Sequence, residues 1–228
     1  MGILVTMAHV LDILTDIALA HKPFTTAELV GLGMSKMTIS RLVSEDRLQR
    51  PMRGIYRIPT EAEDPNFIWA CIARAYPQAV VCLLSAAVHH GLTESMGGTN
   101  VVMIPHAFKG YDKWQIEGGA QFIRTRNQRD LQEGVDKIVV ENTPVSITSP
   151  ERTIVDLFRF STYVNKTGRG FAIDPEGIQD AIGRYLDHPD LTPDTKALRA
   201  IANGYGVWDT LSIVIETTQS AKARLSAT

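Results

Sequence analysis

The sequence contains few of the residues that mark disulfide-rich, membrane or metal-binding proteins. Two cysteines, Cys71 and Cys82, among 228 residues are too few for a disulfide framework or a cysteine-rich zinc site, so we expect two buried, reduced thiols. No run of about 18 apolar residues predicts a transmembrane helix, and no secretory signal pattern is found at the start. Phosphate-binding glycine loops, nucleophile elbows and zinc-protease helices are also missing from the sequence. We therefore expect a cytoplasmic protein that needs no metal and no cofactor.

Excess charge of one sign is scarce overall, but the charges are unevenly distributed. The formal net charge is −2. Residues 1–60 carry +2 and residues 61–228 carry −4, while residues 34–58 alone carry +4. A short basic segment on a neutral-to-acidic chain is typical of a local phosphate-contacting surface. A solvated charged face would give the same count, so the order of the residues has to separate the two interpretations.

The first part of the chain predicts three short helices. Apolar residues recur at helical spacing over residues 8–21, which predicts an amphipathic helix. Thr25 followed by Glu28 is a capping-box pattern, and it predicts the start of a second helix. Ser35 is a suitable cap for a third helix, which we expect over residues 36–46.

A basic hairpin is predicted after the third helix. Two short alternating stretches within residues 47–58 flank a turn that contains proline and glycine. Three helices and such a hairpin define a winged helix-turn-helix, whose third helix reads the major groove and whose wing contacts the DNA backbone. The outward face of the third helix is small, polar and basic, as a groove about 12 Å wide requires. The candidate DNA-binding residues are Lys36, Met37, Thr38, Ser40 and Arg41 on the third helix, and Arg50, Arg53 and Arg57 on the wing. A winged helix used only for protein contact is the alternative.

The rest of the chain predicts a second, mixed domain. An acidic, proline-ended stretch at residues 61–65 is the expected linker, so the domains are residues 1–60 and 61–228. The fold class is therefore α/β of the α+β type: an N-terminal winged helix-turn-helix, a mixed α/β domain and a helical C-terminal part. We expect helices at 66–76, 85–90, 150–161, 175–187, 193–203 and 206–220, strands at 100–104, 120–124, 135–141 and 145–148, and either a strand or a helix start at 79–83.

Residues that could carry catalysis are few and poorly placed for it. His89 and His90 are adjacent, so on a helix they project about 100° apart and cannot both hold one ion; we expect a structural role. Glu151 and Asp156 are similar to a nuclease carboxylate set, but they project about 140° apart on one helix. Arg152 is expected to be structural and to pair with Asp156 four residues later. The sequence therefore predicts a protein that is not an enzyme.

Two motifs, taken in order, resemble a known family. Ser85-Ala86 precedes Gly91-Leu92-Thr93 with four residues between them, and residues 149–156 read Ser-Pro-Glu-Arg-Thr-Ile-Val-Asp. Placed after a winged helix, this arrangement resembles the AbiEi-type antitoxins and transcriptional regulators of bacterial abortive-infection toxin–antitoxin operons. The resemblance extends over about residues 10–160.

The resemblance implies a function for each domain. The winged helix would bind inverted repeats in its own double-stranded promoter DNA and repress the operon. The second domain would carry the antitoxin activity, which would serve in phage defence. It would act against a nucleotidyltransferase-like toxin encoded beside it. In the best-known arrangement of the family, the antitoxin opposes the toxin without forming a stable complex. Two alternatives stay open at this point: an antitoxin that binds its toxin directly through the acidic second domain, and a stand-alone DNA-binding regulator. No membrane partner is expected.

Overall fold

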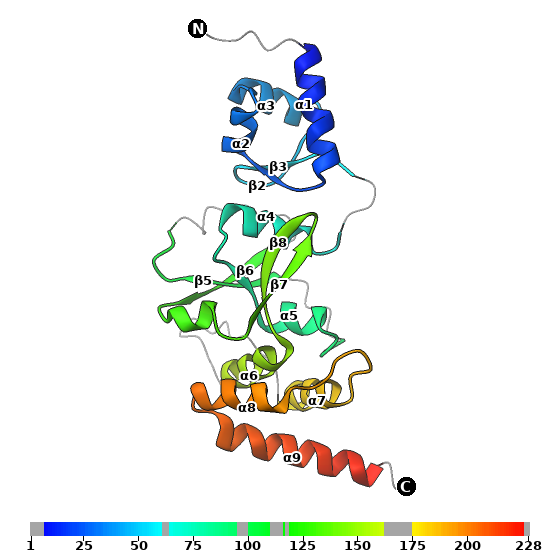
Figure 1. Cartoon of the computed structure of the whole chain (residues 1–228), viewed down its shortest axis with the longest axis vertical. Helices are drawn as coiled ribbons and strands as arrows, with labels where there is room; N and C mark the ends of the chain where they lie inside the picture. Colours follow the sequence, from blue (N-terminus) through cyan, green and yellow to red (C-terminus); the bar gives the residue numbers. More distant parts are fainter. Residues whose placement is uncertain are drawn as a thin grey trace.

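The N-terminal unit is a three-helix core with a small sheet. The structure, a computed structural model, describes residues 7–60, 64–94, 100–109, 116, 119–161 and 175–225. Figure 1 shows three units along the longest axis of the molecule: this N-terminal unit, a central sheet and a group of C-terminal helices. The first unit contains α1 (Met7–Ala20), β1 (Phe24–Thr25), α2 (Thr26–Gly31), α3 (Lys36–Ser44), β2 (Gln49–Met52) and β3 (Ile55–Arg57). The expected winged helix-turn-helix is therefore confirmed.

The three helices form where the sequence predicts them. Thr25 and Glu28 make both halves of the capping box: the Thr25 N–H donates to Glu28 Oε2 at 2.8 Å, and the Glu28 N–H donates to Thr25 Oγ1 at 3.2 Å. These bonds satisfy backbone donors that the first turn of α2 would otherwise leave without partners. The core of the unit contains Val10, Ile13, Leu14, Ile17, Phe24, Leu29, Met34, Ile39, Leu42 and Leu48.

The small sheet contains one strand more than the sequence indicates. Its order is β1-β3-β2, with antiparallel neighbours. The β2–β3 hairpin lies within the predicted range, whereas β1 was not predicted because its two residues are too few to show an alternating pattern.

The central unit is a mixed five-stranded sheet in the order β6-β5-β4-β8-β7. β5 is parallel to β6 and β4 is parallel to β8, while the β4–β5 and β7–β8 pairs are antiparallel. The ambiguous residues 79–83 supply both a strand and the first residue of a helix. The elements are α4 (Phe67–Ala75), β4 (Val80–Val81), α5 (Leu83–His89), β5 (Asn100–Pro105), β6 (Ala120–Thr125), the 3-10 helix η2 (Gln128–Leu131), β7 (Val135–Val140) and β8 (Thr143–Thr148).

The turn between β7 and β8 differs in register from the sequence prediction. The tight connection was expected at residues 142–144. In the structure the two turn residues are Glu141 and Asn142, with φ of 44° and 49°, and Thr143 already pairs with Val140. Two successive left-handed residues match the right-handed twist of a hairpin, and asparagine tolerates that conformation better than most residues.

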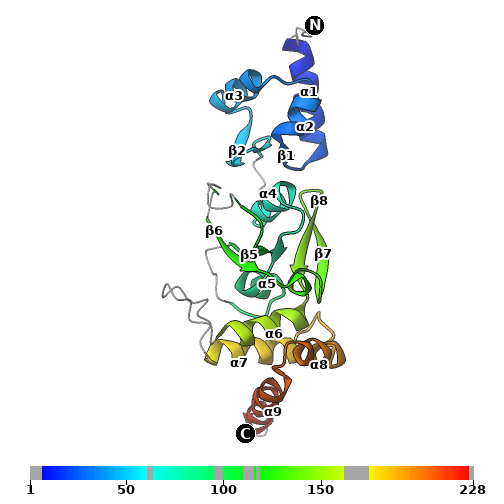
Figure 2. The same ribbon diagram turned by 90° about the vertical axis from the view of Figure 1, so that its left-hand side faces the viewer.

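The C-terminal unit consists of helices packed against the sheet. α6 (Pro150–Ser161) lies next to it, followed by α7 (Pro175–Leu186) and α8 (Thr195–Gly204), and α9 (Trp208–Leu225) lies at the far end of the molecule (Figures 1 and 2). The two cysteines, on α4 and just before α5, are buried free thiols as expected. Burial raises the pKa of the Cys71 thiol to about 12, so neither reactivity nor metal binding is favoured there.

Candidate nucleic-acid interface

Helix α3 presents an exposed polar face on the N-terminal unit. The Ser35 hydroxyl accepts a hydrogen bond from the Thr38 N–H at 3.0 Å and caps the helix where the sequence predicts. Ile39 and Leu42 are buried beneath the helix, whereas Met37 on the outward face is 81% exposed. Three further predicted contact residues, Lys36, Ser40 and Arg41, are also exposed. The face that the sequence assigns to DNA is therefore available.

Two side chains on this face already have partners of different strength. The half-buried Thr38 hydroxyl shares a hydrogen bond with the Ser35 hydroxyl at 2.8 Å, so part of its role is to complete the cap. Arg41 Nε lies 3.6 Å from Glu45 Oε1, and both side chains are well exposed. An exposed pair of this kind contributes at most about 1 kcal/mol, so Arg41 can exchange it for a contact with DNA.

The β2–β3 hairpin is a short wing held against α2. Gly54 lies in the turn with φ of +81°, a conformation that favours glycine. Its carbonyl oxygen accepts a hydrogen bond from the Thr26 N–H at 2.9 Å. Arg50 and Arg53 are exposed on this hairpin, as a backbone-contacting wing requires.

The third predicted wing residue, Arg57, does not face solvent, and its assignment as a DNA contact is wrong. The side chains of Arg57 and Glu141 are each 4% exposed, and Arg57 Nη1 donates to Glu141 Oε1 at 3.0 Å. Arg57 Nε donates to Gln49 Oε1 at 2.8 Å, and the guanidinium lies 4.0 Å from the centre of the Phe67 ring. The sequence could not reveal this because Glu141 follows 84 residues later, in the β7–β8 turn.

Further contacts fix the winged helix to the central unit. The Glu28 carboxylate on α2 accepts a hydrogen bond from Arg74 on α4, and Asn142 Nδ2 donates to the Ala20 carbonyl oxygen at 3.1 Å. Burial raises the pKa of the Glu28 carboxyl, but hydrogen bonds from Arg74 and Thr25 outweigh it and leave the pKa below its usual value. One apolar cluster spans the joint and includes Met52, Ile55, Ile68, Cys71, Ile72, Ala79, Val102 and Ile104. The wing sheet is thus a packing surface on one side.

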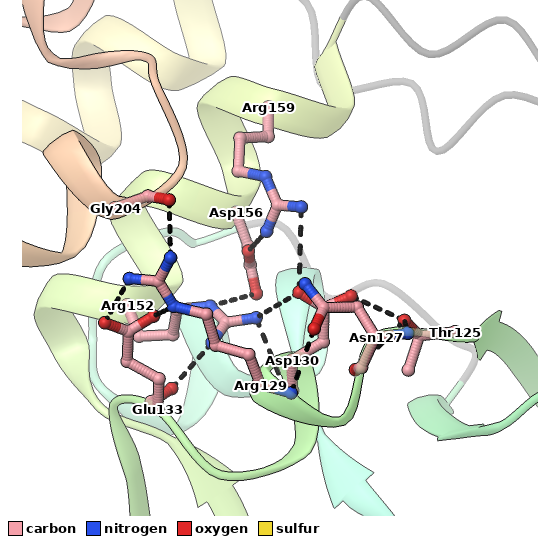
Figure 3. Close-up of polar contacts among 9 residues, drawn as sticks. All are labelled: Thr125, Asn127, Arg129, Asp130, Glu133, Arg152, Asp156, Arg159 and Gly204. Atoms are coloured by element: carbon pink, nitrogen blue, oxygen red, sulfur yellow. Dashed lines mark hydrogen bonds and ion pairs between the residues drawn. The ribbon is translucent and has the colours of Figure 1, made fainter.

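A buried arginine cluster connects the sheet to the C-terminal helices (Figure 3). Arg152 on α6 is fully buried, and its Nε donates to Asp156 Oδ2 at 2.9 Å, which confirms the predicted pair. Its Nη1 donates to the Glu133 carbonyl oxygen at 2.6 Å, and its Nη2 lies 3.6 Å from Asp130 Oδ1. Arg159 Nη1 donates to Asp156 Oδ1 at 2.8 Å. Burial raises the pKa of the Asp156 carboxyl, and the two guanidinium groups oppose that shift.

The cluster is closely packed on its remaining sides. The guanidinium carbon of Arg159 lies 3.8 Å and that of Arg152 lies 4.6 Å from the centre of the Tyr205 ring. Gly134 has φ of +60°, and a Cβ there would lie 2.7 Å from Arg152 Cβ. Arg152 is thus held by groups from α6, from the η2 region and by the Tyr205 ring, so the cluster joins these segments.

The candidate catalytic and metal-binding residues have separate partners. Glu151 accepts a hydrogen bond from Tyr185 Oη at 2.8 Å, whereas Asp156 belongs to the arginine cluster. His90 Nε2 donates to the Thr148 carbonyl oxygen at 2.7 Å, and the His89 ring packs edge-on against Trp69. Within the described ranges, no three His, Cys, Asp or Glu residues are grouped closely enough to hold a metal ion.

The capped helix, its exposed face and the hairpin define the N-terminal unit as a winged helix. Residues 12–59 match the family model described as "Transcriptional regulator, AbiEi antitoxin", which confirms the resemblance over that segment. The whole fold is similar to that of a solved structure, "Crystal structure of RV2827C protein from Mycobacterium tuberculosis". The TM-score is 0.63, with 16% identity, over 92% of this chain and 77% of that one. A comparison with curated proteins gave no match.

None of the helices in the described part of the chain has the length and apolar character that a membrane crossing needs.

Proposed function

We propose that this chain is an antitoxin-type regulator that binds its own promoter through the winged helix and represses the operon. The observation that carries the proposal is the two-sided character of α3. One side is buried through Ile39 and Leu42, and the other leaves Met37 and its polar and basic neighbours in solvent. A recognition helix needs this arrangement, because it must pack on its domain while its other face enters the groove.

The residues would divide the work of recognition by position. Lys36 stands at the N-terminus of α3, where the helix dipole also favours a phosphate. Met37, Ser40 and Arg41 would face base edges in the major groove. Arg50 and Arg53 on the wing would hold phosphates. Inverted repeats would then place two copies of the chain on one operator.

The second domain would act against a nucleotidyltransferase-like toxin. The match of residues 12–59 to antitoxin regulators and the acidic balance of residues 61–228 support that role. Co-expression with the product of the adjacent gene tests the mode of action. A stoichiometric complex would indicate direct neutralisation, and rescue of growth without a complex would indicate an indirect one.

A salt titration of DNA binding tests the assignment of individual residues. Each lysine or arginine that contacts a phosphate contributes about 0.9 to the slope of log K against log salt. Arg53→Ala should therefore flatten the slope by about that amount, whereas Arg41→Ala should relax the base preference. Arg184→Ala, on α7 and paired with Asp180, is the matched control and should bind like the unmodified chain. The wing assignment would be contradicted if Arg53→Ala bound DNA with the same affinity as the unmodified chain at every salt concentration.

A further inference from the structure

A cleft in the central unit lies apart from the winged helix. Its volume is about 720 Å³, within the range of about 300–1,000 Å³ that small-molecule sites occupy. The walls come from the ends of β5 and β6, from η2 and from the end of α6. Residues close in space but distant in sequence therefore form it, and no motif in the sequence indicates it.

Three arginines and one histidine are among the side chains around the cleft. His106, Arg124, Arg126 and Arg159 line it, with Asp130 as the one carboxylate among its described lining residues. The charge of Asp130 is already opposed, because its Oδ1 lies 3.6 Å from Arg152 Nη2 and 3.8 Å from Arg159 Nη2. Excess positive charge in a concave, partly desolvated site favours an anion.

The positive charges of Arg124 and Arg126 also act on His106. Repulsion by Arg124, followed by burial and repulsion by Arg126, lowers the pKa of the His106 imidazole. Arg124 also donates a hydrogen bond to the His106 carbonyl oxygen, which places its guanidinium near that backbone. A dianionic or monoanionic group seated between these residues would relieve the repulsion.

The remaining lining groups suit a flat ligand. The rings of Phe122 and Phe160 are half-buried and line the cleft. Thr125 Oγ1 donates a hydrogen bond to Asp130 Oδ2 at 2.5 Å, and Asp130 Oδ1 is buried beside the two guanidinium groups. An aromatic surface and a cationic rim together match a base and a phosphate.

We propose that this cleft binds a nucleotide, with the phosphate against Arg126 and Arg124 and the base against Phe122 and Phe160. Figure 3 shows Asp130 in contact with Arg152 and Arg159 of the arginine cluster. The proposal goes beyond promoter binding and does not depend on it, because none of these residues belongs to the winged helix.

Isothermal titration calorimetry on the full chain tests the proposal with four purine and pyrimidine nucleoside monophosphates, a nucleoside and inorganic phosphate. At least one nucleotide should bind at least tenfold more tightly than either its nucleoside or inorganic phosphate. Arg126→Gln should weaken that binding at least tenfold, because Arg126 is exposed and carries a rim charge. Arg184→Gln is the matched control, since it removes a half-buried arginine on α7, away from the cleft, and it should bind like the unmodified chain. Circular dichroism would confirm that both variants are folded.

The proposal would be overturned by no saturable binding of any nucleotide at millimolar concentration, by equal binding of inorganic phosphate and nucleotide, or by undiminished binding to Arg126→Gln. Binding of a short single-stranded oligonucleotide without binding of mononucleotides would also overturn it and would assign the cleft to a nucleic-acid strand. NMR titration of the His106 imidazole gives an independent readout. The ligand for this experiment is a cyclic nucleotide, because its phosphodiester does not titrate near neutral pH. The bound ligand should raise the pKa of His106, and an unchanged pKa would contradict the placement of the phosphate.

Discussion

Replacement of Arg57 by alanine separates a buried joint from a DNA contact. The residue lies on the wing, where sequence reasoning assigns it to phosphate binding, but its guanidinium is enclosed between Glu141, Gln49 and the Phe67 ring. The alanine variant leaves the Glu141 carboxylate buried without the guanidinium that pairs with it. The structure therefore predicts a loss of stability rather than a change in the electrostatics of DNA binding.

The expected magnitude follows from the burial of both partners. Removal of one partner from a buried ion pair costs about 3–5 kcal/mol in the free energy of unfolding, because the other charge stays buried without its counter-ion. The contact of the guanidinium with Phe67, at 4.0 Å, belongs to the same loss. Replacement of both partners, Arg57→Met with Glu141→Leu, should recover most of the stability, since no uncompensated charge remains.

Urea unfolding followed by tryptophan fluorescence measures this loss. Arg53→Ala is the matched control on the same hairpin: it removes an exposed arginine and should change the free energy of unfolding by less than about 0.5 kcal/mol. Arg57 would not be a buried joint if Arg57→Ala lowered the free energy of unfolding by less than about 1 kcal/mol and instead flattened the slope of log K against log salt by about 0.9. In that case Arg57 would be a phosphate contact after all.

Three further predictions concern local structure. Gly134→Ala should destabilise the protein by about 2–4 kcal/mol in thermal unfolding, through backbone strain and overlap with Arg152. The control Gly206→Ala has a similar φ of +68° but open space around the new Cβ, so it should cost only about 1–2 kcal/mol. Equal losses of stability in the two variants would contradict the steric argument. Ser35→Ala should cost about 1 kcal/mol by removing the cap of α3, and an unchanged melting temperature would argue against that cap. Burial lowers the pKa of His90, so the unfolded chain binds the proton first and stability is lost as pH falls below about 6.5. His90→Gln should therefore lose less stability than the unmodified chain between pH 7.5 and 5.5. An identical dependence of stability on pH in the two proteins would refute the assignment.

Local signals predicted the helices of this protein well. The cap at Ser35, the capping box at Thr25 and the start of α6 at Pro150 each depend on residues within one turn of the helix end. The pair between Arg152 and Asp156 was predictable for the same reason, because four residues form one turn of a helix. The outward face of α3 followed from its apolar spacing alone.

Contacts between distant segments were beyond these signals. Arg57 has the same chemistry as Arg50 and Arg53, and only the position of Glu141 across the joint distinguishes it. The buried surroundings of Arg152 include Asp130 and the Glu133 carbonyl group from the η2 region, which no spacing rule relates to α6. The cleft beside η2 was missed for that reason as well, since its cationic residues come from three separate elements.

The joint between the two domains also bears on function. The winged helix is tied to the central unit by one buried ion pair, by Glu28 with Arg74 and by Asn142 with the Ala20 carbonyl group. An apolar cluster continues across the same surface. The α3 face and the central unit are therefore held in a fixed relation, unlike units joined by a free linker.

A mobility-shift titration of the full chain on its own upstream DNA tests the central claim most directly. Unrelated DNA serves as competitor, and Met37→Glu on the exposed face of α3 serves as the interface variant. The account predicts specific, salt-sensitive binding that Met37→Glu abolishes while the chain stays folded. No specific binding by the unmodified chain would contradict the account and would leave the winged helix as a protein-contact module.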